Sequence, residues 1–274
     1  MVSKSRRRAR LLSRIFEFGM FVIAAAASAQ PIQTVGAMLD QLASQVSRSR
    51  SYVVIPVAGH VTGAGGTEFR SDVTVVASVP QRVAVAWLAQ GVDNSAEPLD
   101  FFEVGPDPAF FPDMIAATLG KSGLGALVVV GVTAEGAFDP NARLRAFARV
   151  WTPVPGCSGT SSLSMTGSSF VPPSYYSYLT GLILDAGHRG TVGVVNPEPL
   201  PIRAIAHIFR PDYSLVDEVE IVVPGRSMKQ VPMPAADAGP VAVWIEVHDF
   251  HRFAAYATSV DQASGDAWLL SVLP

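Results

Sequence analysis

Apolar residues at every second position are the feature of this sequence that most restricts its fold. From residue 52 onward, short segments such as 82–87, 218–221 and 241–248 alternate apolar side chains with polar or small ones. A β-strand points successive side chains to opposite faces, so this alternation predicts strands that each pack one face on a core. Short strands separated by Gly, Pro, Asn and Asp turns predict an all-β sandwich or barrel.

A single short helix is expected before these strands. Within residues 32–47, apolar side chains recur at helical spacing: Ile32, Val35, Met38, Leu39, Leu42 and Val46. This spacing predicts an amphipathic helix. The segment 30–51 is therefore expected to hold a short helix followed by a polar linker.

Parts of the sequence recur at a shift of 116 to 120 residues. Three pairs of short motifs carry the shift: Ile55-Pro56 and Val171-Pro172, Arg70 and Arg189 with the valines that follow each, and Phe111-Pro112 and Val231-Pro232. A nearly constant shift predicts duplication of a domain of about 100 residues, the usual size of a sandwich. We expect β-sandwich domain 1 at 52–154, a Gly/Ser-rich linker or long exposed loop at 155–169, and β-sandwich domain 2 at 170–274.

The first 29 residues have the pattern of a signal peptide. A basic segment precedes the apolar run 18–27, and residues 27–29 read Ala-Ser-Ala, a small-x-small cleavage site. The run is far shorter than the roughly 20 residues that span a bilayer, which disfavours the alternative of a membrane anchor. We expect cleavage after Ala29, no stable membrane anchor afterwards, and an extracytoplasmic location, either secreted or periplasmic.

Charge and cysteine content argue against several functions. The first 29 residues hold six of the 20 Lys and Arg but one of the 23 Asp and Glu, so the rest of the chain has a formal net charge of −8. Phosphate binding depends on clustered Lys and Arg, so this composition predicts no nucleic-acid partner. The single cysteine, Cys157, forms neither an internal disulfide nor a cysteine-based zinc site.

Two segments share an order of strands and turns: the one that opens IPVAGHVTGAGG at residue 55 in the first half, and GHRGTVGVVNPEPLPIRAIAHIFRPDYS from residue 187 in the second half. This order resembles a repeat found in exported bacterial proteins with tandem immunoglobulin-like β-sandwich domains. It covers about residues 52–274, and it departs from the repeat where Ser78-Val79-Pro80 replaces an Asn-Pro turn. The resemblance implies the fold and an exported location, and it implies no catalytic residue.

One group of aromatic residues is a candidate ligand site. Tyr175, Tyr176 and Tyr178, together with Phe170, lie within one short segment, and aromatic faces can stack on sugars or on apolar partners. The alternative is ordinary strand packing, with alternate rings inside and outside, because aromatic residues are normal strand formers.

A second candidate is the densest polar cluster, Glu246, His248, Asp249 and His251, of which Glu246, His248 and His251 are the candidate metal ligands. Imidazole and carboxylate groups are suitable ligands for zinc or copper. Glu246 and His248 share a strand face, and His251 is expected to return across a hairpin turn. The alternative is a solvated hairpin tip, because no further, distant ligand is visible.

These observations predict an exported protein that is not an enzyme and uses no cofactor. Its expected role is structural, adhesive or partner-binding, with a protein or a glycan as the partner. Two alternatives stay open: a carbohydrate-binding protein that uses the tyrosine cluster, and a cryptic metal-dependent hydrolase centred on His248 and His251. The Gly-x-Ser-x-Gly elbow of serine hydrolases is absent from the sequence.

Overall fold

The computed structural model describes residues 32–44, 50–63, 66–154, 156, 158–171, 176–234, 237–248, 251–265 and 267–271. The named elements in these ranges are sixteen strands, the helix α1 and one π-helical turn. All pairs between named strands are antiparallel, so the predicted all-β fold is confirmed. The predicted signal peptide, residues 1–29, lies outside the described residues.

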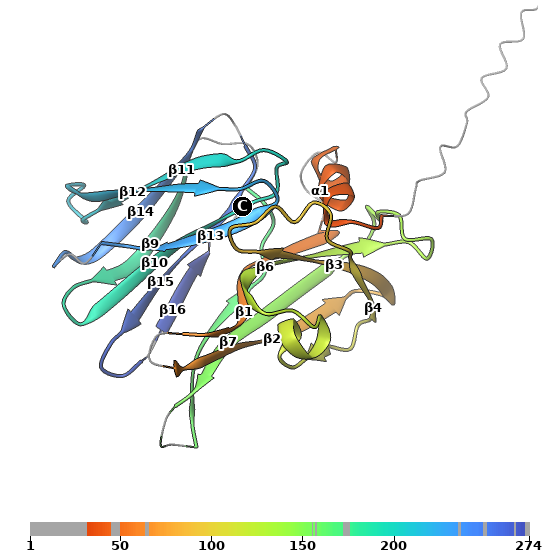
Figure 1. Cartoon of the computed structure of the whole chain (residues 1–274), viewed down its shortest axis with the longest axis horizontal. Coiled ribbons are helices and arrows are strands. Elements are labelled where there is room, and N and C mark those ends of the chain that lie inside the picture. The colour runs from red at the N-terminus through yellow and green to blue at the C-terminus, as the bar shows by residue number, and fades with distance from the viewer. Residues whose placement is uncertain are drawn as a thin grey trace, which may run out of the picture.

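The first half arranges its strands in two layers (Figure 1). The strands are β1 (Tyr52–Thr62), β2 (Glu68–Ala77), β3 (Gln81–Ala89), β4 (Asp100–Val104), β5 (Ala109–Phe111), β6 (Gly123–Val132), β7 (Leu144–Pro153) and β8 (Thr160–Thr166). One layer has the order β4-β3-β6-β1 and the other has the order β5-β2-β7-β8. The layers join where β1 and β2 pair at their common hairpin end.

The second half has the same strand orders in two separate sheets. Its strands are β9 (Tyr176–Leu184), β10 (His188–Asn196), β11 (Ile202–Phe209), β12 (Leu215–Val223), β13 (Ser227–Pro232), β14 (Gly239–Val247), β15 (Ala254–Asp261) and β16 (Ala267–Ser271). They form the sheets β12-β11-β14-β9 and β13-β10-β15-β16. Adding eight to each strand number of the first half reproduces both orders.

Two of the three recurring sequence motifs occupy matching places in these sheets. Val73 pairs with Phe111 between β2 and β5, as Val192 pairs with Val231 between β10 and β13. The third motif does not match. Ile55 lies within β1, whereas the segment aligned with it precedes β9.

The alternation predicted from sequence sets which side chains enter the core. In β14, Val241, Val243, Ile245 and Val247 are buried, and the residues between them face outward. The buried residues pack against the apolar positions of β9, β10 and β11. Each fully buried Val or Ile contributes about 1.5–3 kcal/mol relative to an exposed position, so these strands supply much of the stability of the second half.

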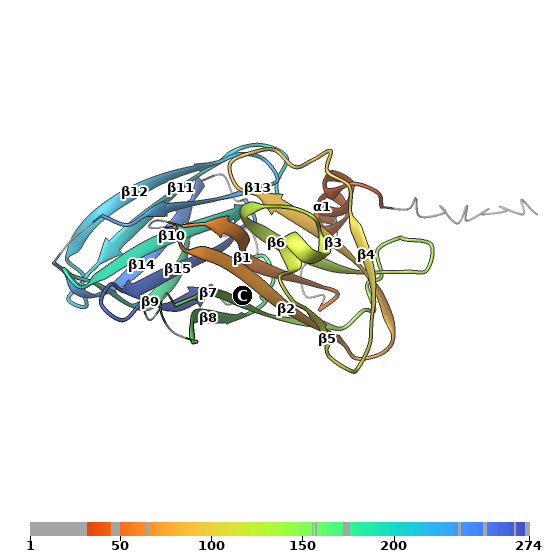
Figure 2. The same cartoon turned by 60° about the horizontal axis from the view of Figure 1, so that its bottom comes forward.

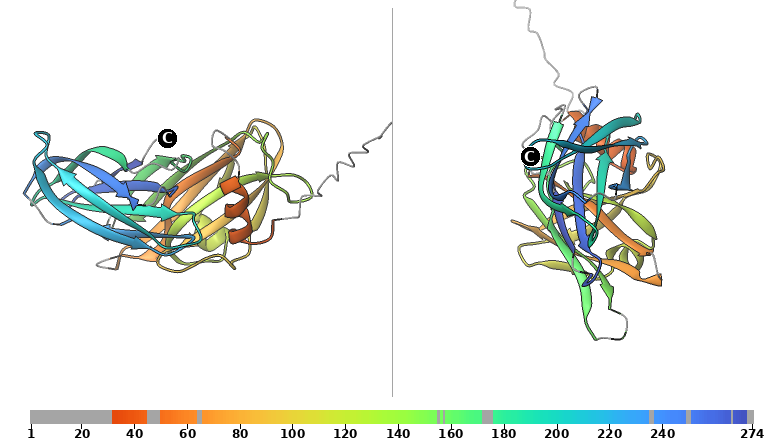
Figure 3. Two further views of the ribbon diagram at one scale, coloured as in Figure 1. Left: turned by 90° about the horizontal axis from the view of Figure 1, so that it is seen from above. Right: turned by 90° about the vertical axis from the view of Figure 1, so that its left-hand side faces the viewer.

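Helix α1 (Val35–Ser44) lies against the first half (Figure 3). Val35, Met38 and Leu39 of its apolar face are buried in the core of that half. The Thr34 hydroxyl accepts a hydrogen bond from the Ala37 backbone N–H at 3.3 Å, which caps the first turn. The predicted helix is therefore present over 35–44, and none of the described helices has the length and apolarity needed to cross a membrane.

A strand occupies part of the segment expected to be a linker. Residues 160–166 form β8, which pairs with β7 along its whole length. Met165 is buried and Leu163 is half-buried, while Ser and Thr residues occupy the alternate positions. This alternation suits an edge strand, although the Gly, Ser and Thr content suggested a flexible linker or exposed loop. Residues 160–166 are thus part of the β5-β2-β7-β8 layer.

The two halves share buried surface. Val195, Met228, Ala254 and Tyr256 of the β13-β10-β15-β16 sheet belong to the same apolar cluster as the core of the first half. β13 contacts β6, and β15 contacts β1 (Figures 1 and 2). A backbone hydrogen bond of 3.0 Å from the Gly91 N–H to the Met228 carbonyl also joins them. Part of the outer face of this sheet is therefore a packing surface against the first half.

Candidate functional site

The outward side of the β12-β11-β14-β9 sheet carries a group of rings that we call the aromatic face. Its members are Tyr176 and Tyr178 on β9, Trp244 on β14, and His207 and Phe209 on β11. They point outward because the residues that alternate with them are buried. Tyr176 and Tyr178 are 50% and 58% exposed, so much of this face is open to solvent.

Strand pairing brings these rings into contact. Trp244 lies opposite Tyr178 in the β9–β14 register. The centroids of Tyr178 and Trp244 are 5.9 Å apart with planes 28° from parallel, and those of Trp244 and Phe209 are 6.2 Å apart with planes 27° from parallel. Tyr176 meets Trp244 edge-on at 5.6 Å. Such ring pairs each contribute about 0.5–1.5 kcal/mol to stability beyond the burial of the rings. Trp244 takes part in all three pairs, so it stabilises the row.

A hollow of about 710 Å³ adjoins the row of rings. Tyr178, Phe209 and Trp244 form one part of its lining, and Arg210 and Tyr213 from the turn after β11 form another. Tyr213 is 87% exposed, and its backbone N–H donates to the Arg210 carbonyl at 2.9 Å. A hollow of this size, mostly apolar with a few polar groups, lies within the range of small-molecule sites.

At the other end of the aromatic face, His207 lies between two carboxylates. Its Nδ1 is 2.7 Å from Glu218 Oε1, and its Nε2 is 3.2 Å from Glu246 Oε2. The side chain of His207 is only 15% exposed. Each ring nitrogen of His207 therefore lies within hydrogen-bond distance of a carboxylate oxygen.

A charged pair extends this polar end along β11 and β12. Arg203 Nε donates to Glu220 Oε1 at 2.6 Å. The hydrogen bond and the guanidinium charge lower the pKa of Glu220, and the same contacts raise the pKa of Arg203. Both side chains are solvent-exposed, so this pair contributes little to stability. It does place a guanidinium and a carboxylate at the edge of the aromatic face.

The structure brings part of the two predicted sites together. Tyr176 and Tyr178 lie on the aromatic face, and Glu246 lies directly opposite Tyr176 in the β9–β14 register. Tyr175 is outside the described residues. The tyrosine cluster and the polar cluster, taken from sequence as separate candidates, therefore meet on one sheet.

The predicted metal ligands do not assemble as a site among the residues described. Glu246 Oε1 is 4.0 Å from His248 Nδ1, and the other oxygen of Glu246 contacts His207. His251 joins no such cluster. In the described ranges, no group of three or more His, Cys, Asp or Glu side chains is arranged to hold a metal ion.

Sequence reasoning missed Trp244, His207 and Phe209 as members of the site. The segment 202–209 alternates as the other strands do, and this pattern is a signal that would place His207 and Phe209 on one face. That β11 and β9 flank β14 is a property of the sheet order, and local sequence pattern carries no signal for it.

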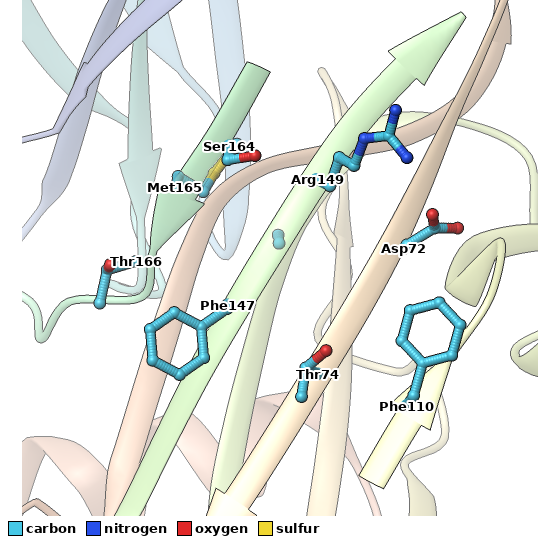
Figure 4. A pocket seen from close by; sticks show the side chains of 9 residues that line it. Asp72, Thr74, Phe110, Phe147, Arg149, Ser164, Met165 and Thr166 are labelled. Carbon is cyan, nitrogen blue, oxygen red and sulfur yellow. The ribbon is translucent and has the colours of Figure 1, made fainter. Parts of the chain in front are cut away.

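A second, shallower hollow of about 430 Å³ lies on the outer face of the β5-β2-β7-β8 layer (Figure 4). Thr74 lies between Phe110 and Phe147, and Asp72 lies opposite Arg149 in the next row. Asp72 and Arg149 both form hydrogen bonds within the protein. In this hollow, Thr74 separates the two rings, Phe110 and Phe147. The aromatic face is therefore the stronger candidate for a binding site.

No protein-family model and no curated protein matches this sequence. Matches among solved structures include one of the infectious bursal disease virus Gx strain, with 8% identity over 81% of this chain and 67% of that chain and a TM-score of 0.20. Another is a glycosyl hydrolase family 2 member from Bacteroides cellulosilyticus DSM 14838, with 11% identity over 80% of this chain and 28% of that chain and a TM-score of 0.17. At these TM-scores neither match bears on function, and the resemblance to exported sandwich repeats stays a prediction.

Proposed function

We propose that this chain is an exported, non-catalytic binding protein that recognises a carbohydrate through its aromatic face. The observation that carries the proposal is the row formed by Tyr178, Trp244 and Phe209, with planes 27–28° from parallel, beside an open hollow. The face of an aromatic ring carries partial negative charge, and the C–H groups of a sugar ring carry complementary partial positive charges. A row of nearly parallel rings therefore suits a chain of sugar units.

Polar groups beside the row support a polyol over a purely apolar ligand. Arg210 and Tyr213 line the hollow, and Glu246 lies two residues from Trp244 on the same face of β14. A guanidinium donates to sugar hydroxyls, a carboxylate accepts from them, and a phenol does both. The arrangement combines an apolar platform with a few orienting hydrogen-bonding groups, as in other small-molecule sites.

The position of His207 favours binding over hydrolysis. Two carboxylates that flank a glycosidic bond are the usual machinery of glycosidases. Here Glu218 and Glu246 flank His207, whose ring nitrogens contact an oxygen of each. The imidazole thus occupies the space between the carboxylates, where a glycosidic oxygen and its water would have to lie.

The matched strand orders also support an origin by duplication. We propose that each half is a copy of one immunoglobulin-like sandwich, because the sheet orders differ only by eight in strand number and Val73 and Val192 have equivalent partners. A crystal structure with different strand orders in the two halves would refute this.

For export, we expect N-terminal sequencing of protein recovered outside the cytoplasm to begin at Gln30. Recovery of the protein only in the cytoplasm, with residues 1–29 intact, would count against export.

The carbohydrate proposal is tested with a glycan array followed by calorimetric titration on residues 30–274. We expect one class of glycan to bind, and Trp244→Ala to weaken it by roughly tenfold or more, as for an aromatic hot spot. Phe110→Ala is the matched control, because Phe110 is also an exposed ring but lies on the first half. Absence of glycan binding by the wild type, or an equal loss in both variants, would refute the proposal.

A further inference from the structure

A cavity of about 560 Å³ lies where the two halves meet. The first half contributes Val57 and Val61 of β1 and Leu163 of β8, and the second half contributes Met233, Tyr256 and Val260. Most of the lining is apolar. The cavity is therefore a gap in the shared packing of the two halves, with a size in the range of ligand sites.

The polar groups inside this cavity already have partners. The Tyr256 hydroxyl donates to Gln230 Oε1 at 2.6 Å, and the hydroxyls of Thr191 and Thr258 bond to each other at 2.6 Å. Burial raises the pKa of Tyr256 far above its ordinary value, so this phenol stays neutral. The interior consequently suits a hydrocarbon chain better than a polar molecule.

A cation, Arg189, stands at the cavity. Arg189 belongs to the lining and is exposed, and among the residues described no carboxylate forms an ion pair with it. Arg70, the arginine at the equivalent position of the first half, has partners within the protein. Arg70 pairs with Glu68 at 3.1 Å and stacks over the Trp151 ring at 5.6 Å.

The sequence explains why Arg189 lacks these contacts. Trp151 lies opposite Arg70 in β7, whereas Val260 lies opposite Arg189 in β15. The residue two positions before Arg70 is Glu68, and the residue two positions before Arg189 is Gly187. Both intramolecular partners have thus been replaced, and the guanidinium is left beside an apolar cavity.

We infer that this cavity binds a single-chain amphiphile with an anionic head, such as a long-chain carboxylate. The hydrocarbon chain would lie between the halves, against Val61, Leu163 and Val260. The carboxylate would pair with Arg189, because a guanidinium matches a carboxylate in charge and in the geometry of its donors. This site is separate from the aromatic face and does not depend on carbohydrate binding.

The test compares two soluble amphiphiles of equal chain length, dodecanoate and dodecyltrimethylammonium, below their micelle concentrations. Calorimetric titration of the wild-type chain should show one dodecanoate bound, with weaker binding of the cation. Arg189→Gln should weaken dodecanoate binding by roughly tenfold or more, as expected for loss of a charge-assisted contact, without weakening that of the cation. Arg70→Gln is the matched control and should bind dodecanoate within about twofold of the wild type.

A second variant tests the cavity itself. Val260→Trp, at a half-buried position of β15, should fill the space and abolish dodecanoate binding, while Trp244→Ala should leave it intact. No saturable binding to the wild type would overturn the inference. Unchanged binding in Arg189→Gln, or an equal loss in Arg70→Gln, would overturn it as well. If Val260→Trp does not fold, the comparison of the two arginine variants still decides the matter.

Discussion

Tyr178 and Trp244 face each other across β9 and β14, with ring centroids 5.9 Å apart and planes 28° from parallel. This contact joins a residue expected in a ligand site to one that the sequence did not single out. Trp244 also contacts Tyr176, His207 and Phe209. The platform proposed for carbohydrate binding therefore depends on a single indole at its centre.

The first prediction concerns the structural role of that indole. Trp244→Ala should lower the free energy of unfolding by about 1–3 kcal/mol, because it removes four ring contacts at a half-buried position. Phe110→Ala, at a ring that is 60% exposed, should cost under about 1 kcal/mol. Urea denaturation of both variants measures the difference, and equal losses would show that the row of rings contributes no packing of its own.

The second prediction concerns the contact between Gly193 and Tyr256 at the junction of the halves. A Cβ added at Gly193 would overlap ring carbons of Tyr256, which is fully buried. Gly193→Ala should therefore destabilise the chain by about 1–3 kcal/mol, as overpacking does. The control Gly105→Ala, where an added Cβ meets nothing within 4 Å, should be neutral or slightly stabilising.

A double-mutant cycle identifies the cause. If the ring of Tyr256 is the obstacle, Gly193→Ala combined with Tyr256→Leu should cost at least about 0.5 kcal/mol less than the sum of the single changes. Strict additivity in denaturant titrations would mean that the alanine acts elsewhere.

Local periodicity was enough to predict the class of fold and several faces. Val243 and Ile245 enter the core as the alternation of 241–248 indicated, and α1 lies within the range that its apolar spacing predicted. Pairing between distant strands is different, because it is decided by the sheet as a whole. Glu246 was therefore assigned to a hairpin cluster with His251, although its contact is with His207 from the neighbouring strand.

In one segment, the amino-acid composition and the alternation of residues favour different structures. The segment 155–169 is rich in Gly, Ser and Thr, which favoured a linker, yet Leu163 and Met165 sit at alternate positions inside it. An edge strand needs only one apolar face, and two apolar residues were enough to supply it. The core that the two halves share could not be predicted from the alternation of residues. Alternation does not indicate what a buried side chain packs against, and Tyr256 packs on residues of the other half.

The third prediction concerns stability in acid. The carboxylate of Asp261 accepts hydrogen bonds from the backbone N–H groups of Ala263 and Ser264, which lower its pKa. The Ser214 hydroxyl and backbone N–H lower the pKa of Asp212 in the same way. A group whose pKa is lowered by folding stabilises the protein above its unfolded value, about 3.9 for Asp, and loses that contribution as pH falls through the folded value.

The unfolding free energy should therefore decrease as the pH falls from about 5 to below about 3. Asp261→Asn keeps an acceptor oxygen but cannot titrate, so the variant should lose less stability over this range than the wild type. Urea midpoints measured at several pH values test this. If the stability of the two proteins falls in parallel as the pH is lowered, other carboxyl groups determine the loss of stability in acid.

The fourth prediction is that the two halves unfold together. Asn94 lies in the first half and is 2% exposed, and its Nδ2 donates to the carbonyls of Ala89, Val92 and Arg226, the last across the junction at 2.9 Å. With Tyr256 in the core of the first half as well, calorimetry should show one transition whose calorimetric and van't Hoff enthalpies agree.

Asn94→Ala should weaken that coupling. Loss of these hydrogen bonds at a buried position should lower the free energy of unfolding by about 1–3 kcal/mol. Asn141→Ala, at an exposed turn of the first half, should change it by less than about 0.5 kcal/mol. Two resolved transitions in the wild type would mean that the halves are independent folding units and that the shared apolar cluster does not couple them.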